Sequence, residues 1–359
     1  MQHADAGTTP DTFAPRLLTW FDRHGRHDLP WQHPRTAYRV WLSEIMLQQT
    51  QVAVVIRYFQ RFVDALPDIP ALAAADLDTV QALWSGLGYY SRARYLHRAA
   101  QICMQTHGGK LPNDVDSLMA LPGIGRSTAG AILAQAHGQR IAILDGNVKR
   151  TLARFHGVHG WPGTTAVEKK LWTLAEEHLP HARLADYTQA VMDFGATLCT
   201  RAAPACVVCP LQDDCVARIE GIVERLPEPR PGKALPTRRC VMLLLFDADG
   251  RVLLQRRPER GVWAGLWSLP ELPDAQTARD WLATQVTDAF DAGQRLTTVA
   301  HGFSHYLLDI DPILWRDVRA RARIADNAAL RWAARDELLA IGLPSPVRKL
   351  LSSPEVLQP

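Results

Sequence analysis

The stretch LPGIGRSTAGAILAQAHGQRIAILDGNVKR, residues 121–150, contains the strongest local signals for the fold of the first part of this chain. Gly123 and Gly125 permit positive φ, so a turn here can present successive backbone N–H groups outward. Ser127 or Thr128 is a suitable N-cap for the alanine-rich helix that follows. Such a turn is suited to hold a phosphate group. An ordinary glycine-rich connection between two helices has the same letters, and short glycine motifs carry a high false-positive risk.

The end of this stretch places a carboxylate beside an apolar run. Residues 141–144 are apolar, and Asp145, Gly146 and Asn147 follow them directly. We therefore expect Asp145 at the edge of a core, in a loop that leads into a helix. The alternative is an ordinary aspartate at the end of a buried segment.

Length and composition are those of an ordinary folded protein. A chain of 359 residues can form two domains with separate cores, and 47% hydrophobic with 21% charged residues excludes disordered and fibrous classes. The net charge of +3 argues only weakly for nucleic acid, so local basic clusters such as Arg92, Arg94 and Arg98 matter more. The N-terminus lacks a signal-peptide core and no run is long enough to span a bilayer, which predicts a cytoplasmic protein.

Apolar periodicity divides the chain into two parts. Residues 1–222 have the three-to-four spacing of helices, which predicts an all-α domain. The expected helices include residues 37–63, 71–84, 91–107, 114–120, 127–137, 147–155, 165–178 and 183–198. Residues 223–236 are rich in proline and predict a semi-rigid interdomain linker. Residues 237–359 predict an α+β domain, with strands near 240–246, 251–255, 296–300 and 305–315.

The motif WLSEIMLQQTQV, residues 41–52, contains a carboxylate among large apolar side chains. Glu44 either faces solvent, as most glutamates on amphipathic helices do, or is a partly buried carboxylic acid. Burial disfavours the charged carboxylate and raises its pKa, which a general acid needs near neutral pH. The run from Gln48 to Gln51 adds polar donors and acceptors in the middle of the expected helix over 37–63.

A second motif, LWSGLGYYSRARYLHRAA at residues 83–100, combines aromatic and basic side chains. Gly86 and Gly88 predict a turn, which Tyr89 and Tyr90 follow. A rigid aromatic side chain beside phosphate-seeking arginines suits a protein that opens a duplex and fills the gap. Core packing is the alternative for either tyrosine, and we expect it for Tyr90.

Four of the six cysteines are close in sequence, with the spacing C-x6-C-x2-C-x5-C. They are Cys199, Cys206, Cys209 and Cys215. In a reducing compartment such a set favours a metal site over disulfides. Thiolates accept either zinc or an iron–sulfur cluster, and spacing alone leaves the choice open, with zinc the commoner ion. Cys103 and Cys240 lie outside the motif and are expected in cores.

Taken together, the motifs resemble those of the adenine DNA glycosylases (MutY type) in the helix-hairpin-helix DNA glycosylase superfamily. The resemblance implies a first domain with a six-helix barrel and a hairpin that grips the DNA backbone through the turn with Gly123, Gly125 and Ser127. It also implies that the four cysteines hold a [4Fe–4S] cluster. In this family the residue matching Glu44 protonates adenine, and Asp145 stabilises the sugar cation or traps it briefly as a covalent adduct.

The same resemblance assigns further contacts to DNA. Asn147 orients the catalytic groups, Gln49 wedges into the base stack, Tyr89 intercalates, and Gln189 contacts the edge of adenine. Residues 237–359 resemble a Nudix-type domain, but the glutamate pair of the Nudix box falls on Ala283 and Thr284. Because those glutamates hold the magnesium, we expect the fold without its hydrolase activity.

The resulting hypothesis is a monomeric base-excision enzyme that removes adenine mispaired with 8-oxoguanine or guanine in duplex DNA. Ser127 stands where the related bifunctional enzymes have a Schiff-base lysine, so we expect an abasic product, with any nicking slow and incidental, through nearby Lys149. The loop of Phe303, Ser304 and His305 matches the family's lesion-reading loop. The alternatives are an endonuclease III-like bifunctional glycosylase/lyase, a Nudix hydrolase, and a noncatalytic iron–sulfur DNA-binding protein.

Overall fold

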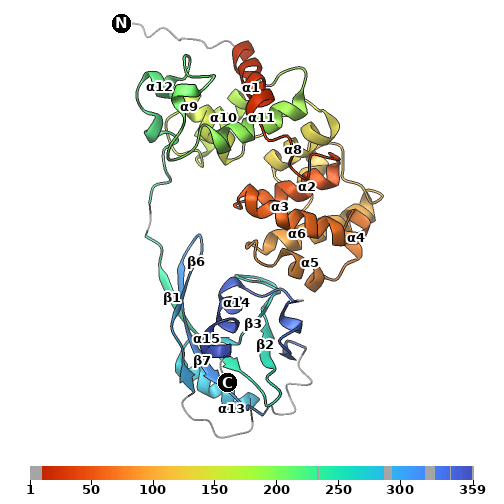
Figure 1. The fold of residues 1–359 in the computed structure, drawn as a ribbon, viewed down its shortest axis with the longest axis vertical. Helices are drawn as coiled ribbons and strands as arrows, with labels where there is room; N and C mark the ends of the chain where they lie inside the picture. Colours follow the sequence, from red (N-terminus) through yellow and green to blue (C-terminus); the bar gives the residue numbers. More distant parts are fainter. Residues whose placement is uncertain (1–9, 233, 287–292, 320–327, 340, 358–359) are drawn as a thin grey trace. The chain divides into compact units, whose positions relative to one another are not determined.

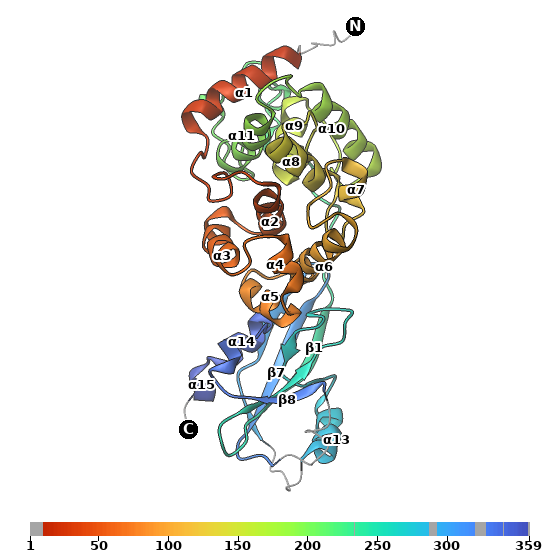
Figure 2. The same ribbon diagram turned by 90° about the vertical axis from the view of Figure 1, so that its right-hand side faces the viewer.

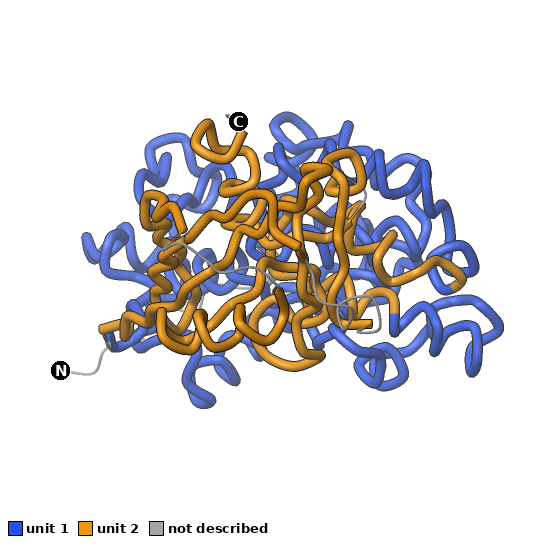
Figure 3. Tube along the Cα trace, turned by 90° about the horizontal axis from the view of Figure 1, so that it is seen from below, with its two compact units in different colours: residues 1–73, 98–232 blue, residues 74–97, 233–359 orange. Residues whose placement is uncertain are grey.

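The computed structural model describes residues 10–232, 234–286, 293–319, 328–339 and 341–357, which form two compact units. Unit 1 contains residues 1–73 and 98–232, and unit 2 contains residues 74–97 and 233–359 (Figure 3). The segment 74–97 therefore belongs with the C-terminal residues, although it lies within the stretch expected to be one all-α domain. Among the described helices, none is long and apolar enough to cross a membrane.

Unit 1 is helical, and α8 lies at its centre, in contact with α2, α7 and α11 (Figures 1 and 2). Its helices are α1 (Pro10–His24), α2 (Ala37–Leu47), α3 (Val52–Ala65), α4 (Ile69–Ala74), α7 (Val115–Met119), α8 (Arg126–His137), α9 (Gly146–Phe155), α10 (Thr165–Glu177), α11 (Leu184–Thr197) and α12 (Val216–Ile219), with the 3-10 turns η1 (Cys206–Val208) and η2 (Val223–Arg225). The helix α6 (Ser91–Thr106) runs from one unit into the other. A core of large side chains, including Phe13, Trp20, Phe155 and Phe194, joins α1, α9 and α11.

The prediction of a single helix over residues 37–63 is wrong, because a loop separates α2 from α3. Gln49 adopts φ of 57°, which an α-helix cannot contain, and Gln51 becomes the N-cap of α3. The side chain of Gln49 is exposed, so the polar run forms a surface loop. The expected helix over 71–84 is likewise interrupted, since α5 (Leu77–Trp84) starts anew after Asp76.

The glycine turn before α8 also differs in detail from the expectation. Gly123 has φ of 81°, as predicted, but Gly125 has φ of −95° and is itself the N-cap of α8. Ser127 does not cap the helix, because its Oγ accepts a hydrogen bond from the backbone N–H of Leu144 at 3.0 Å. The hydroxyl thus fixes the extended segment 141–144 against the start of α8.

Close contact between α8 and this extended segment depends on Gly130. A Cβ atom at this position would lie 2.5 Å from the carbonyl oxygen of Ala142. Since that neighbour is backbone, it cannot move away without displacing the segment that carries Asp145. A helix interior normally disfavours glycine relative to alanine, so the close approach explains its presence here.

The described residues of unit 2 form two sheets. The larger sheet has the order β4-β1-β7-β5, with β6 also paired to β7, and the smaller sheet has the order β3-β2-β8. The strands are β1 (Thr237–Leu245), β2 (Val252–Arg256), β3 (Trp267–Ser268), β4 (Glu271–Leu272), β5 (Gln294–Arg295), β6 (Val299–Gly302), β7 (Leu307–Trp315) and β8 (Leu330–Ala333). The unit also contains α5, the start of α6, the helices α13 (Ala275–Gln285), α14 (Ser345–Leu351) and α15 (Pro354–Leu357), and the 3-10 turn η4 (Glu337–Leu339).

Long-range pairing organises these strands. β1 pairs in parallel with β7 along its whole length, from Thr237 opposite Leu307 to Leu245 opposite Trp315. The strands expected on either side of the turn at 247–250 do form, but β1 and β2 enter different sheets, and an isolated bridge joins Phe246, directly after β1, to Val252. Cys240 is buried in this core, and Cys103 is buried on α6, as expected.

We predict that Gly130→Ala destabilises the protein by about 1–3 kcal/mol, although alanine is the better helix former. The added methyl group meets backbone rather than a flexible side chain. Urea unfolding of the purified protein measures the change. Gly232→Ala is the control, because nothing lies within 4 Å of the added atom, and it should leave the midpoint unchanged. An equal or higher midpoint for Gly130→Ala would contradict this account of the contact.

Candidate active site

A cleft in unit 1 brings together residues that are far apart in sequence. It has an empty volume of about 1330 Å³. Five of the residues singled out in the sequence line it: Glu44 from α2, Ser127 from α8, Asp145 and Asn147 at the start of α9, and Gln189 from α11. Polar and apolar side chains both line the cleft, so a planar polar molecule could be enclosed and oriented in it.

Glu44 is an acid whose charged form is disfavoured. Burial raises its pKa to about 8, and the nearby carboxylate of Asp145 acts in the same direction. A hydrogen bond with Gln135 opposes this change in pKa without cancelling it. Glu44 is therefore largely protonated at neutral pH, so it can donate a proton inside the cleft.

Asp145 has a different environment, although burial also raises its pKa. Its Oδ1 accepts the backbone N–H of Val148 at 2.8 Å, which makes it the N-cap of α9. Its Oδ2 accepts from Nδ2 of Asn147 at 3.3 Å. These donors lower the pKa of Asp145 and so offset part of the rise that burial causes, whereas Glu44 has one side-chain hydrogen bond of this kind, with Gln135. The two carboxyl groups of the cleft thus differ in the donors that stabilise their charged forms.

Arg150 holds Asn147 in place, and no motif in the sequence indicated this role. Its Nη2 donates to Oδ1 of Asn147 at 2.8 Å and to the carbonyl oxygen of Gly195 at 2.6 Å. Its Nε donates to the carbonyl oxygen of Cys199 at 2.8 Å. Because Oδ1 of Asn147 is taken by Arg150, the amide group must turn its Nδ2 toward Asp145.

Gln189 is held by a second pair that was not expected, Arg26 and Asp193. Asp193 is fully buried and its Oδ1 accepts from Nε2 of Gln189 at 2.8 Å. Arg26 donates to the same carboxylate through its backbone N–H at 2.8 Å and its Nε at 2.9 Å. The Oε1 of Gln189 is buried without a hydrogen-bond partner among the described residues, so it is a free acceptor beside the cleft. An i, i+4 spacing of Gln189 and Asp193 on a buried helix face is the signal that could have revealed this pair.

The other expected contact residues lie elsewhere. Gln49 is exposed in the loop between α2 and α3 and does not line the cleft, although its neighbours Gln48, Thr50 and Gln51 do. Gly123 and Gly125 form the turn before α8, as described above. Tyr89 belongs to unit 2, where its side chain is 50% exposed, while Tyr90 is 5% exposed and packs in the core as predicted.

Unit 2 contains a second pocket, with an empty volume of about 1120 Å³. It is lined by Tyr89 together with the loop of Phe303, Ser304 and His305. Trp263, which the sequence did not indicate, also lines it and lies near Phe303, with the ring centroids 5.2 Å apart. The pocket therefore combines exposed aromatic faces with the hydroxyl of Ser304.

Further along unit 2, the Nudix-box position keeps one carboxylate but not its partners. Glu271 forms an ion pair with Arg257, with 3.0 Å between Nη1 and Oε2. On α13, Ala283 and Thr284 supply no carboxylate at the positions of the expected glutamate pair. A glutamate that is already paired with an arginine, together with two neutral side chains, is unsuited to hold magnesium.

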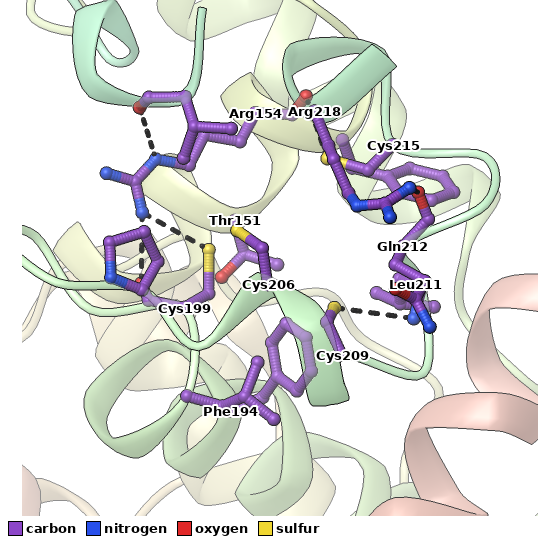
Figure 4. A pocket seen from close by; sticks show the side chains of 14 residues that line it. Thr151, Arg154, Phe194, Cys199, Cys206, Cys209, Leu211, Gln212, Cys215 and Arg218 are labelled. Carbon is purple, nitrogen blue, oxygen red and sulfur yellow. Dashed lines mark hydrogen bonds between the residues drawn. The ribbon is translucent and has the colours of Figure 1, made fainter. Parts of the chain in front are cut away.

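The four cysteines of the C-x6-C-x2-C-x5-C motif surround a cavity of about 400 Å³ of empty volume in unit 1 (Figure 4). All four thiols are free. Burial raises the pKa of Cys209 to about 12, so without a positive partner its thiolate is strongly disfavoured. Across the described ranges, no three His, Cys, Asp or Glu side chains converge closely enough to hold a metal ion.

The fold and the cleft define a DNA glycosylase of the helix-hairpin-helix class. Residues 42–177 match the family described as the HhH-GPD superfamily base excision DNA repair protein, and residues 241–353 match the NUDIX domain. A solved thermostable thymine-DNA glycosylase aligns with 59% of this chain and 97% of its own, with a TM-score of 0.54 and 26% identity. A solved endonuclease III–DNA complex shares the fold, with a TM-score of 0.50 and 20% identity over 58% of this chain and 94% of its own.

Curated relatives narrow this class. An adenine DNA glycosylase of Buchnera aphidicola is 38% identical over 95% of this chain and 97% of its own length. The human adenine DNA glycosylase is 35% identical and covers 82% of this chain and 65% of its own length. The chain belongs to the adenine DNA glycosylase family. It is a DNA-repair enzyme that binds DNA and hydrolyses the N-glycosidic bond of adenine.

We predict that Glu44→Gln is more stable than the wild-type protein, and that the difference grows as the pH rises from 4.5 to about 8. Unfolded Glu44 ionises near its ordinary pKa of 4.5, whereas the folded protein holds the proton until about 8. Rising pH between these two values therefore favours the unfolded wild type, by about 1.4 kcal/mol for each pH step of one. Urea unfolding at pH 5 and pH 8 measures this difference. A difference that does not change with pH would mean that Glu44 titrates normally.

Proposed function

We propose that Glu44 is the acid that protonates adenine and that Asp145 is the carboxylate that supports the resulting sugar cation. The observation that carries this proposal is one cleft with two carboxylic acids in different environments. Protonation of a ring nitrogen makes adenine a neutral leaving group, so the glycosidic bond can break. The pairing follows the logic of retaining glycosidases, in which one carboxyl group gives a proton and the other faces the anomeric carbon.

Asn147 and Gln189 complete the proposed site. Nδ2 of Asn147 donates to Asp145 and so aims the carboxylate. The free Oε1 of Gln189 can accept a hydrogen bond from the exocyclic amino group of adenine, while Asp193 prevents the amide from turning around. Guanine carries a carbonyl oxygen at the corresponding position and would repel Oε1. This contact would therefore help to select adenine as the extruded base.

DNA contacts follow from the remaining residues. The turn with Gly123 and Gly125 ends at the N-terminus of α8, where free N–H groups suit a backbone phosphate, and Ser127 lies beside it. The exposed side chains of Gln49 and Tyr89, both in left-handed backbone conformation, suit insertion into the base stack that adenine leaves. We propose that the protein acts as a monomer on duplex DNA, at the nucleoid.

The reaction is proposed to end at an abasic site. Ser127 has no amine, and its Oγ is engaged by the N–H of Leu144. The amine of Lys149 is held 2.6 Å from the carboxylate of Glu168, so it is not free to attack the sugar. Both observations disfavour the endonuclease III-like bifunctional alternative.

Cys199, Cys206, Cys209 and Cys215 are proposed to hold a [4Fe–4S] cluster. The donor set fits, because four free thiols surround one cavity and two of them already receive hydrogen bonds. Nη1 of Arg154 is 3.5 Å from Sγ of Cys199, and the backbone nitrogen of Leu211 is 3.4 Å from Sγ of Cys209. When bound, the cluster would tie the loop over 199–215 into one rigid element.

The proposed substrate is adenine opposite 8-oxoguanine, and unit 2 is the proposed reader of the damaged base. In this proposal Glu44 and Asp145 act on the extruded adenine in the cleft of unit 1, so recognition of the opposite base requires another surface. The second pocket places the hydroxyl of Ser304 among the aromatic rings of Tyr89, Phe303 and Trp263. A hydroxyl both donates and accepts, as the additional N–H and carbonyl of 8-oxoguanine require.

To test the catalytic assignment, adenine release from 8-oxoguanine:adenine, guanine:adenine and thymine:adenine duplexes is measured under single-turnover conditions. Asp145→Asn should slow release by about 10²–10³-fold, since it removes charge while asparagine still caps α9. The wild-type rate should fall as the pH rises through about 8, because only protonated Glu44 is active. The DNA strands should stay intact until alkali is added, because the product is an abasic site.

The control for the catalytic assignment is Asp116→Asn, which changes an exposed aspartate. Wild-type speed in Asp145→Asn would disprove the assignment.

A second test addresses the lesion. Ser304→Ala should weaken the preference for 8-oxoguanine over guanine by on the order of 1 kcal/mol, the value of one hydrogen bond. The ratio of the single-turnover rates on the two duplexes, at subsaturating enzyme, measures this preference. Ser352→Ala changes an exposed serine of the same unit outside the pocket and serves as the control. An equal loss on both duplexes would show that Ser304 does not read the lesion.

A further inference from the structure

A buried hydroxyl lies unpaired next to the four cysteines. Thr151 is on α9, only 2% exposed, and it lines the same cavity as the cysteines. Its Oγ1 has no hydrogen-bond partner in the described part of the chain. Figure 4 draws this side chain among the residues that line the cavity, with Cys199 and Cys206 beside it in that view.

Such a hydroxyl is unusual for a helical threonine. Threonine in a helix can donate to the carbonyl oxygen one turn earlier, and most buried hydroxyls in proteins have a partner. Ser43, for example, donates to the carbonyl oxygen of Val40 at 2.8 Å. A valine would fill the position of Thr151 equally well without burying a polar atom. The free donor therefore points to an acceptor that belongs in the cavity.

The acceptors proposed for this cavity are anionic sulfur atoms. The site already directs two donors at cysteine sulfurs, from Arg154 to Cys199 and from Leu211 to Cys209. Arg154 and Thr151 both lie on α9, and Leu211 lies in the loop that carries the cysteines, so the hydroxyl of Thr151 is a third possible donor to this cavity. We propose that Thr151 donates an O–H···S hydrogen bond to the cluster or to one of its thiolate ligands. This inference rests on the cluster proposed above.

A hydrogen bond to sulfur has a definite electronic effect. It withdraws electron density from the sulfur and so stabilises the more reduced, more negative state of the cluster. It also covers a sulfur atom that an oxidant or a chelator would otherwise reach. Loss of the hydroxyl should therefore lower the reduction potential and speed the loss of iron, while the acid and the carboxylate of the cleft keep their own contacts.

The test compares the full-length, iron-loaded wild type with Thr151→Val, which has the same shape without a hydroxyl, and Thr151→Ser, which keeps the hydroxyl. Voltammetry on DNA-modified electrodes, with the electrode as electron donor and acceptor, should show a lower potential for the valine variant only. The expected change is up to tenfold in the ratio of reduced to oxidised cluster, or about 59 mV for one electron. Fe–S stretching bands should lose their D₂O-sensitive component in the same variant, and iron should leave it several-fold faster in a chelator.

Each outcome supports or contradicts the proposed hydrogen bond from Thr151. Identical potentials, Raman bands and iron-release rates in all three proteins would overturn the role of Thr151 and leave the cluster in place. Wild-type protein that purifies with zinc, or without iron and sulfide, would overturn the cluster and this inference together. If the valine variant takes up no iron, normal uptake by the serine variant supports the hydroxyl, and failure of both variants contradicts it.

Discussion

The hydrogen bond from the N–H of Val148 to Asp145 fixes one side of the cleft, because it ties the carboxylate of Asp145 to the first turn of α9. The helix then continues from the cleft to the cysteine cavity. Along it, Asn147 lines the cleft and Arg150 donates to the carbonyl oxygen of Gly195 on the neighbouring α11, while Thr151 and Arg154 line the cavity. The small size of Gly195 on α11 makes this possible, since a Cβ there would lie 2.6 Å from the Cβ of Asn147. A small shift of α9 would thus disturb both sites.

A second constraint is the cost of burying carboxyl groups. Desolvation raises the pKa of both Glu44 and Asp145, but only Asp145 receives a backbone N–H and an amide N–H in return. Glu44 is instead kept neutral, which is unfavourable for stability at neutral pH and favourable for proton donation. Asp193, which is buried on α11 and does not line the cleft, accepts hydrogen bonds from Arg26 and Gln189. The three carboxyl groups therefore differ in the donors that they receive.

Much of this could be predicted from local sequence. The helices from α6 to α11 lie within two residues of their expected positions, since glycine, proline and capping residues mark their ends. The prediction of one continuous helix failed between Leu47 and Val52. The apolar spacing continues through this stretch, although the structure ends one helix and begins another there. Prediction from the sequence also failed at Ser127, which was expected to be a cap but bonds to the N–H of Leu144. Partners distant in sequence cannot be read from a helical pattern.

The sequence by itself indicated the class of the protein through the resemblance of its motifs to those of a known family: one acid in an apolar helix, one carboxylate after an apolar run, and four spaced cysteines. The way in which these groups act depends on how the helices pack. Burial raises the pKa of Glu44, Arg150 orients Asn147, Asp193 fixes Gln189, and an unpaired hydroxyl of Thr151 lies beside the cysteines in the described structure. These properties arise from desolvation and from contacts between separate helices, and neither quantity is a function of local residue order.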